Sequence, residues 1–280
     1  MMPRYFIHLS YDGTNYSGWQ FQANAPSVQE TINKALHKLL QQTIRSTGCG
    51  RTDAGVHAKD FYMHFDAENE IADLKDFLFR LNCVLPHDIS VFKIFRVEDK
   101  AHTRFHATER TYEYYVYFNK SPFIQRYGYY QGFYRVDWGK VLAATEFLKT
   151  IEDFTSLCLK SEDFKTNICL IKEVKWDILP SQHLVIKPFD IEDKGSPLAL
   201  PHPTKSGEVF RFTISANRFL RGMVRKIVGT ALMVGKGKME LEEFKDTVTN
   251  RKNFRIHYLA PPQGLFLSKI KYPSIMNRTT

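Results

Sequence analysis

The stretch GCGRTDAGVHA, from Gly48 to Ala58, places a carboxylate, a guanidinium and an imidazole close together in the sequence. Taken alone, Asp53 in its Asp-x-Gly context is typical of a plain turn in which the carboxylate bonds its own backbone. Arg51 stands two residues earlier, and its guanidinium can keep the carboxylate ionised and oriented. An ionised, oriented carboxylate can act as a nucleophile or a base. Asp53 is therefore a candidate catalytic residue, with a turn residue as the alternative.

Other chemistries fit this stretch and its neighbours less well. The glycines suggest a phosphate-binding loop, but no Lys-Ser/Thr pair follows and no helix begins there, as a Walker or Rossmann motif requires. Cys49 with His57 would suit a thiol hydrolase, although nothing in the sequence shows that the thiol is activated. His102 and His106 have the spacing of metal ligands on a helix, yet no carboxylate stands at a matching offset. We expect these two to be surface histidines, and we expect no metal and no nucleotide cofactor.

The net charge of +9 comes entirely from the later part of the chain. Residues 1–110 hold 13 Lys and Arg against 13 Asp and Glu, whereas residues 111–280 hold 26 against 17. A basic field of this kind favours a polyanionic partner, most simply nucleic acid, and a solvated basic surface is the alternative. The tyrosine-rich segment TYEYYVYF that begins at Thr111 packs in a sheet for the most part, but one or two of its rings could stack on a nucleobase.

The first part of the chain shows the periodicities of an α+β unit. Ser27 and Glu30 form a capping box at the start of the clearest helix. The loop that carries Asp53 joins two strands. The expected elements are a strand at 4–11, a helix at 28–41, a strand before the loop, a strand at 61–65, a helix at 71–85 and a strand at 91–97. This β-α-β-β-α-β order is that of a ferredoxin-like or RRM-like unit.

From Thr111 a second α/β pattern follows. It comprises strands at 111–118, 172–179 and 208–216, helices at 140–150, 218–235 and 239–249, and a closing strand at 264–272. The helix at 218–235 has an apolar stripe, and its basic residues are expected on the other faces: Arg218, Arg221, Arg225 and Lys226. Residues 187–208, rich in Pro, Gly and charge, are expected to form a surface excursion between two strands.

The composition is that of an ordinary soluble globular protein, with 43% apolar and 25% charged residues. The 4 cysteines lie far apart and suggest neither a zinc site nor a disulfide framework. The first residues contain no long apolar stretch of a secretory leader, and no apolar run approaches the roughly 20 residues that span a bilayer. We therefore expect a cytoplasmic protein.

The stretch GCGRTDAGVHA also resembles the GxGRTDAGVHA signature of the tRNA pseudouridine synthase A family. The similarity extends along nearly the whole chain in four further motifs. These are YDGTNYSGWQFQ followed by SVQETINKAL, then TRFHATERTYEYYVY, FLRGMVRKIVG and APPQGLFL. Five ordered motifs are a far more specific signal than any one of them.

The resemblance implies an enzyme that isomerises uridine to pseudouridine at positions 38, 39 and 40 in the tRNA anticodon arm, without a cofactor and as a homodimer. Asp53 takes the place of the family's catalytic aspartate. Arg51 matches an arginine implicated in flipping the target base, and Tyr112 matches a tyrosine that stacks on the uracil. Arg225 aligns with the basic residue near the carboxylate, and Leu265 lies in a strand that helps to wall the pocket.

We therefore predict an α+β fold of two ferredoxin/RRM-like halves. The halves form a mixed, mainly antiparallel sheet flanked by helices, with a central active-site cleft. Residues 1–107 are expected to be an N-terminal α/β domain carrying the catalytic loop, and residues 108–280 a basic, RNA-binding C-terminal α/β domain. A non-catalytic RNA-binding module is the alternative function, because it would use the same basic field and tyrosines.

Overall fold

A computed structural model of the chain describes residues 2–159, 166–180, 196–197, 208–256 and 258–273. The chain divides into two compact units. Unit 1 comprises Met1–Arg110 with Phe266–Thr280, and unit 2 comprises Thr111–Leu265. The domains expected at 1–107 and 108–280 remain a prediction. The last strand lies mostly in the first unit. The reason is that it pairs with a strand of unit 1.

In unit 1, β1 (Arg4–Tyr11) is the central strand of the sheet. It pairs antiparallel with both β3 (His57–Asp66) and β4 (Ile89–Val97). The short β2 (Thr47–Gly48) is antiparallel to β3, and β10 (Leu265–Lys271) is parallel to it. Apart from the short 3-10 turn η1 (Gly13–Asn15), this element order is the predicted β-α-β-β-α-β, followed by the late strand.

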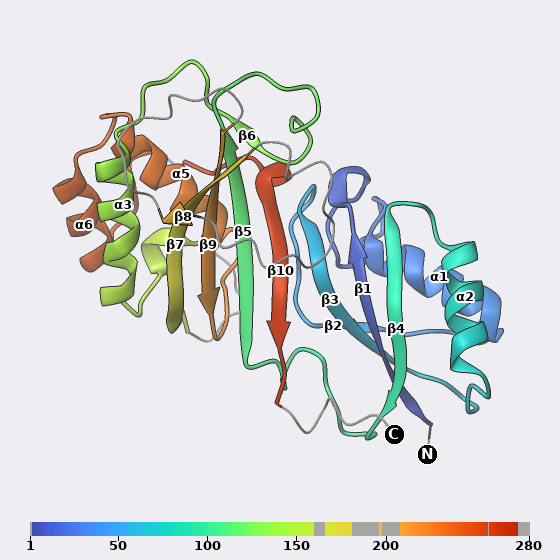
Figure 1. The fold of residues 1–280 in the computed structure, drawn as a ribbon. Helices are drawn as coiled ribbons and strands as arrows, with labels where there is room; N and C mark the ends of the chain where they lie inside the picture. The colour runs from blue at the N-terminus through green and yellow to red at the C-terminus, as the bar shows by residue number, and fades with distance from the viewer. Residues whose placement is uncertain (1, 160–165, 181–195, 198–207, 257, 274–280) are drawn as a thin grey trace. The chain divides into compact units, whose positions relative to one another are not determined.

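Two helices, α1 (Val28–Leu40) and α2 (Leu74–Val84), lie side by side against one face of this sheet (Figure 1). Ser27 caps α1 as predicted, because its hydroxyl accepts a hydrogen bond from the Glu30 amide at 3.3 Å. Asp73 is the N-cap of α2, and its carboxylate accepts from two backbone amides. Near its start β1 is buried on both faces, since the neighbouring residues Tyr5 and Phe6 are 2% and 1% exposed and successive side chains of a strand point to opposite faces.

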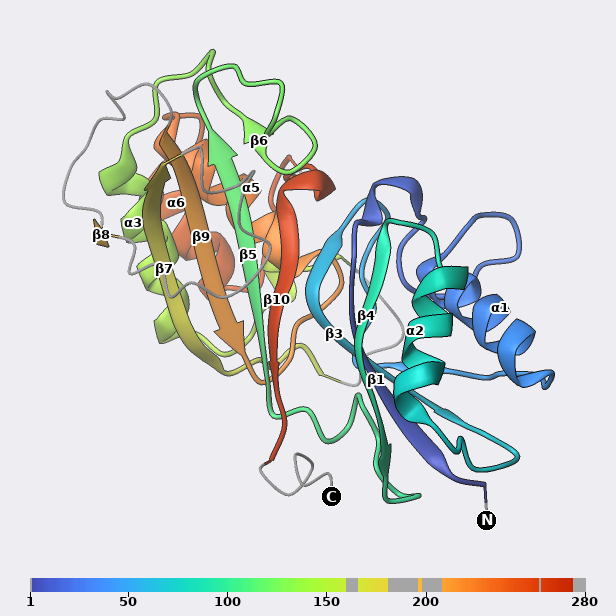
Figure 2. The same cartoon turned by 45° about the vertical axis from the view of Figure 1, so that its right-hand side comes forward.

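Unit 2 has the strand order β5-β9-β7-β8, and β6 is parallel to β5. Its helices pack together on one side of these strands (Figure 2). Its core is aromatic: Trp138 stacks on Phe210 with ring centroids 4.1 Å apart. The elements are β5 (Glu109–Tyr117), β6 (Tyr129–Tyr130), α3 (Trp138–Glu146), β7 (Ile171–Pro180), β8 (Ser196–Pro197), β9 (Glu208–Ala216), α5 (Met223–Gly235), α6 (Leu241–Thr249) and the 3-10 turns η2 (Phe147–Thr150), η3 (Thr155–Leu157) and η4 (Pro262–Gly264).

The helix α5 corrects two expectations. It begins at Met223 and not at Arg218, because Gly222 adopts a left-handed conformation with φ of 63° that interrupts the helix. Lys226 is not on a polar face, since it is 2% exposed and its ammonium donates to the Cys158 carbonyl at 3.2 Å. Burial lowers the pKa of this ammonium. The predicted apolar stripe within α5 is confirmed, with Val224, Ile227, Val228, Ala231 and Leu232 all buried.

The described elements confirm an α+β fold of mostly antiparallel strands flanked by helices. The ferredoxin-like character of the two halves and the central cleft remain predictions. The excursion at 187–208 lies outside the described residues except for 196–197 and 208.

Candidate active site

The candidate catalytic loop connects β2 to β3 in unit 1. Asp53 is half-buried there and Arg51 is exposed. The Val56 amide donates to the Asp53 carbonyl at 3.1 Å, which closes a four-residue turn. The third residue of this turn, Gly55, has φ of 74°, as a turn with a left-handed residue at that position requires. Asp53 is therefore a turn residue. The bond that closes the turn uses its backbone carbonyl, so the turn does not explain why the side chain is a carboxylate.

The segment Tyr11–Trp19 holds the backbone of this loop in place. The Trp19 amide donates to the Thr52 carbonyl at 3.2 Å, and the Gly55 amide donates to the Tyr16 carbonyl at 3.2 Å. The hydroxyls of Tyr11 and Thr52 are 2.8 Å apart and buried. The residues on both sides of Asp53 are thus fixed by hydrogen bonds to one neighbouring segment.

Two glycines of that segment make the close approach possible. A Cβ on Gly18 would lie 2.3 Å from the Thr52 carbonyl oxygen, and Gly18 has φ of 93°. A Cβ on Gly13 would lie 2.1 Å from the Val56 carbonyl oxygen. Neither site has room for a side chain without moving the loop.

His57 is buried directly after the loop and pairs with Asp12. Its Nδ1 is 2.9 Å from the Asp12 carboxylate and 3.1 Å from the Gly13 amide nitrogen. The same ring nitrogen cannot both donate to the Asp12 carboxylate and accept from the Gly13 amide. We assign a proton to His57 Nδ1, which donates to Asp12, because a carboxylate is the stronger acceptor. Burial acts to raise the pKa of Asp12, but the hydrogen bonds from His57 and Thr14 outweigh it and hold that pKa well below its usual value.

The Cys49 thiol is unsuited to nucleophilic chemistry. The residue is 0% exposed, and burial raises the pKa of the thiol to about 12, an effect that a hydrogen bond from the Tyr62 amide only partly offsets. His57, its partner in the thiol hydrolase interpretation, is engaged with Asp12. The geometry therefore disfavours that interpretation.

The remaining predicted site residues, Tyr112, Arg225 and Leu265, belong to unit 2. The half-buried Tyr112 ring packs edge-to-face on Phe219, with centroids 4.9 Å apart. The Arg225 guanidinium donates from Nε to the Ala260 carbonyl at 2.8 Å, and the Arg225 carbonyl accepts from the Ala260 amide at 3.0 Å. Leu265 is buried at the start of β10. Tyr112 and Arg225 thus each have a side-chain partner within unit 2.

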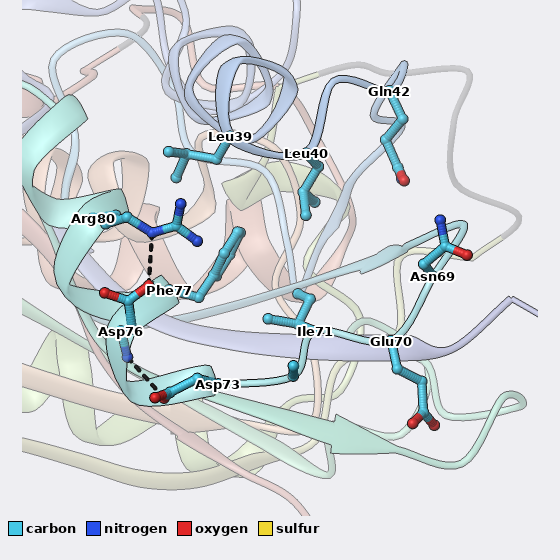
Figure 3. A pocket seen from close by; sticks show the side chains of 11 residues that line it. Leu39, Leu40, Gln42, Asn69, Glu70, Ile71, Asp73, Asp76, Phe77 and Arg80 are labelled. Carbon is cyan, nitrogen blue, oxygen red and sulfur yellow. Dashed lines mark hydrogen bonds and ion pairs between the residues drawn. The ribbon is translucent and has the colours of Figure 1, made fainter.

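A pocket of about 320 Å³ lies between the end of α1 and the start of α2 (Figure 3). Leu39, Leu40 and Phe77 form its apolar part. It contains none of the predicted site residues. Its charged residues are three acids and one arginine: Glu70, Asp73, Asp76 and Arg80. This net negative lining is unfavourable for a polyanion such as RNA, and the pocket is not our candidate site.

Comparison with known proteins identifies the family. A family model described as tRNA pseudouridine synthase matches residues 151–273. The tRNA pseudouridine synthase A of Bacteroides fragilis is 41% identical over 273 residues, which cover 97% of each chain. The enzyme of Porphyromonas gingivalis is 39% identical over 98% of each chain. The enzyme of Thermoanaerobacter sp. is 31% identical over 97% of this chain and 100% of its own.

The chain belongs to the tRNA pseudouridine synthase A family. It is accordingly an enzyme of an isomerase family. Within the part of the chain that the structure describes, no helix is long and apolar enough to cross a membrane.

Local sequence patterns do not reveal the residues that support the candidate catalytic loop. From the sequence, His57 is considered only as a possible partner of a thiol, and Asp12 and Gly13 stand only within a motif of the family resemblance. The sequence contains one signal of this support, which is Gly18 in an aromatic-rich loop just before a well-capped helix. Such a glycine marks a position of close backbone approach, but its partner, Thr52, lies too far along the sequence to be identified from periodicity.

Proposed function

We propose that this enzyme converts uridine to pseudouridine at positions 38, 39 and 40 in the anticodon stem-loop of tRNA, with Asp53 as the catalytic residue and without a cofactor. Membership of the tRNA pseudouridine synthase A family supports the reaction class. The observation that supports Asp53 most is the fixed loop: a half-buried carboxylate on a backbone that Tyr11–Trp19 holds on both sides. A reaction that needs an aligned carboxylate benefits from such preorganisation.

The chemistry is an isomerisation, so atoms and electrons balance within the substrate. The C1′–N1 bond of uridine breaks, the uracil turns, and C5 bonds to C1′. The proton on C5 is then lost to a base, and N1 is protonated. Asp53 acts either as the nucleophile at C1′, which leaves when C5 bonds there, or as the base that removes a ribose proton when the first bond breaks and returns it when the new bond forms. Both routes use an ionised carboxylate and no oxidant.

The target uridine must leave its stack before this can happen, at a cost of a few kcal/mol. Arg51, which is exposed on the same loop as Asp53, is suited to fill the vacated space or to hold a phosphate. In the proposed site the Tyr112 ring stacks on the freed uracil and its hydroxyl accepts the C5 proton. The family resemblance assigns Arg225 a role near the carboxylate and Leu265 a role in the wall of the pocket.

The remaining parts of the proposal follow the family resemblance. We infer a homodimer, a cytoplasmic location, a catalytic N-terminal domain at 1–107 and a basic tRNA-binding domain at 108–280. The mass in solution, measured by light scattering, tests the dimer.

A non-catalytic RNA-binding module is less well supported. Such a module would have no need of a fixed loop carrying an Arg-x-Asp pair, and the isomerase relatives do not favour it. An activity assay separates the two.

The direct test is Asp53→Asn, which keeps the size of the side chain and removes its charge. Release of tritium from tRNA labelled at C5 of uridine should be lost, while tRNA binding persists. Asp76→Asn, the same change at an exposed ion pair with Arg80 on α2, is the matched control and should keep wild-type activity. Turnover by Asp53→Asn near the wild-type rate would rule out the assignment.

A further inference from the structure

Two lysines of unit 2 lie over one tyrosine ring. The Nζ atoms of Lys236 and Lys238, just after α5, are 4.1 and 5.0 Å from the centre of the Tyr134 ring. A cation over an aromatic face is attracted by its negative potential. The ring therefore holds two positive charges close to one point of the surface.

The backbone around this group is fixed by hydrogen bonds. The Asp137 amide donates to the Gly235 carbonyl at 2.7 Å, which joins the segment before α3 to the end of α5. The amides of Gly237 and Lys238 donate back to the last turns of α5, each at 3.0 Å. The Tyr134 amide donates to the Gln131 carbonyl at 3.0 Å. The positions of the two lysines are thus set by the fold.

No carboxylate neutralises this pair among the described residues. Two other lysines of unit 2 do have such partners: Lys149 pairs with Glu146 and Lys245 with Glu242. Burial and, after it, the charge of Lys238 lower the pKa of Lys236 to about 8. A bound anion would relieve this repulsion, so the electrostatics favour a negatively charged ligand at this point.

Exposed aromatic surface adjoins the two charges. Phe133 is 84% exposed and its ring meets Tyr130 edge-on, with centroids 5.4 Å apart, while Tyr134 is 44% exposed. Flat rings beside ammonium groups match the two parts of a nucleotide, since bases stack on aromatic side chains and phosphates bind lysines. A symmetric contact of this surface with its own copy would instead bring four ammonium groups together.

We propose that Phe133, Tyr134, Lys236 and Lys238, the aromatic–lysine patch, form an RNA-contact surface that binds backbone phosphates and stacks on an exposed base. The identity of the RNA as the tRNA substrate rests on the proposed function. The patch contains none of the residues assigned to the chemistry, so it contributes to binding and not to the chemical step.

The test is the double variant Lys236→Glu/Lys238→Glu, with fluorescence anisotropy of labelled tRNA measured over a range of salt concentrations. We expect Kd and KM to rise at least about tenfold, and the slope of log K against log salt to fall in magnitude by about 2, as expected for two lost phosphate contacts. The kcat at saturating tRNA should be unchanged. The matched control, Lys149→Glu/Lys245→Glu, makes the same change in net charge at ion-paired lysines of the same unit and should alter Kd far less.

Phe133→Ala tests the stacking component without changing charge. Because the ring is 84% exposed, its removal should leave the thermal unfolding temperature unchanged and weaken tRNA binding about fivefold or more. This variant keeps the proposal testable if the double variant folds poorly.

Two results would overturn the proposal that the aromatic–lysine patch binds RNA. One is a double variant whose tRNA affinity and salt slope equal those of the matched control. The other is a change in oligomeric state with unchanged tRNA affinity, which would make the patch an interface between copies. Failure of the proposed function looks different, because the wild type would then bind tRNA at the patch without forming pseudouridine.

Discussion

Gly18→Ala should uncouple the catalytic loop from the segment that holds it. The added methyl group starts 2.3 Å from the Thr52 carbonyl oxygen, where ordinary van der Waals contact begins at 3.4 Å. Either Gly18 or the Thr52–Asp53 backbone must therefore move by roughly 1 Å. Both are tied into hydrogen bonds, since the Trp19 amide binds the same Thr52 carbonyl.

The size of the effect can be worked out from two contributions. A non-glycine residue at the Gly18 φ of 93° costs about 1 kcal/mol, and overpacking against backbone costs about 1 to 3 kcal/mol. We expect the free energy of unfolding to fall by about 2 to 4 kcal/mol. A misplacement of about 1 Å near a reacting group lowers the rate about 100-fold, so kcat should fall by that order even in fully folded enzyme.

Two other glycines separate these contributions. Gly237 has φ of 66° and open space around its Cβ position, so Gly237→Ala should lose only about 1 kcal/mol of unfolding free energy. Gly50 has open space and no positive φ, so Gly50→Ala should change stability by no more than about 0.5 kcal/mol. Urea unfolding measures the stability of all three, and tritium release at saturating tRNA measures kcat for Gly18→Ala. If Gly18→Ala matched Gly50→Ala in stability and kept wild-type kcat, Gly18 would have no part in positioning Asp53.

Two further predictions concern groups beside the loop. Asp12→Asn should lower the free energy of unfolding at pH 7 by about 1 to 3 kcal/mol, because it weakens the charged hydrogen bond to His57. The pKa of Asp12 is lowered in the folded state, so its ionised form contributes stability above the unfolded-state pKa of about 3.9, and this contribution is lost as the pH falls. The difference between wild type and variant, followed by urea unfolding from pH 7 downward, should shrink on acidification, and a growing difference would be inconsistent with the pairing. The Cys49 thiol, with a pKa of about 12, should resist alkylation by iodoacetamide at pH 8 while the exposed Cys83 reacts, as peptide mass spectrometry can measure. Labelling of Cys49 at the rate of Cys83 would mean that the Cys49 thiol is accessible and that its pKa is not raised.

Local patterns predicted the elements whose stability is local. The helix α1 followed from its capping residue Ser27 and its apolar spacing, and the long strands of both units followed from alternation and β-branched or aromatic content. The two-residue strands β6 and β8 were not predicted. Capping and amphipathic burial act within a few residues, so a single sequence displays them.

Other features depend on contacts between residues far apart in the sequence, which local patterns do not predict. Lys226 appeared to belong to a polar face, yet the Cys158 carbonyl, 68 residues away, accepts a hydrogen bond from its ammonium and permits burial. The parallel pairing of β10 with β3 joins residues more than 200 positions apart. The candidate site shows the same division: Asp53 and Arg51 could be selected from their types and spacing, but the support from Gly13, Gly18 and the Asp12–His57 pair depends on tertiary contacts.

The most direct test of the central claim is to map pseudouridine in tRNA from cells that lack this protein and carry either the wild-type or the Asp53→Asn gene. We predict that pseudouridine at positions 38, 39 and 40 is absent without the protein, is restored by the wild type and is not restored by Asp53→Asn, although that variant is present at a normal level. Pseudouridine at these positions in cells that carry only Asp53→Asn would contradict the catalytic assignment. Its presence in cells without the protein would contradict the proposed function.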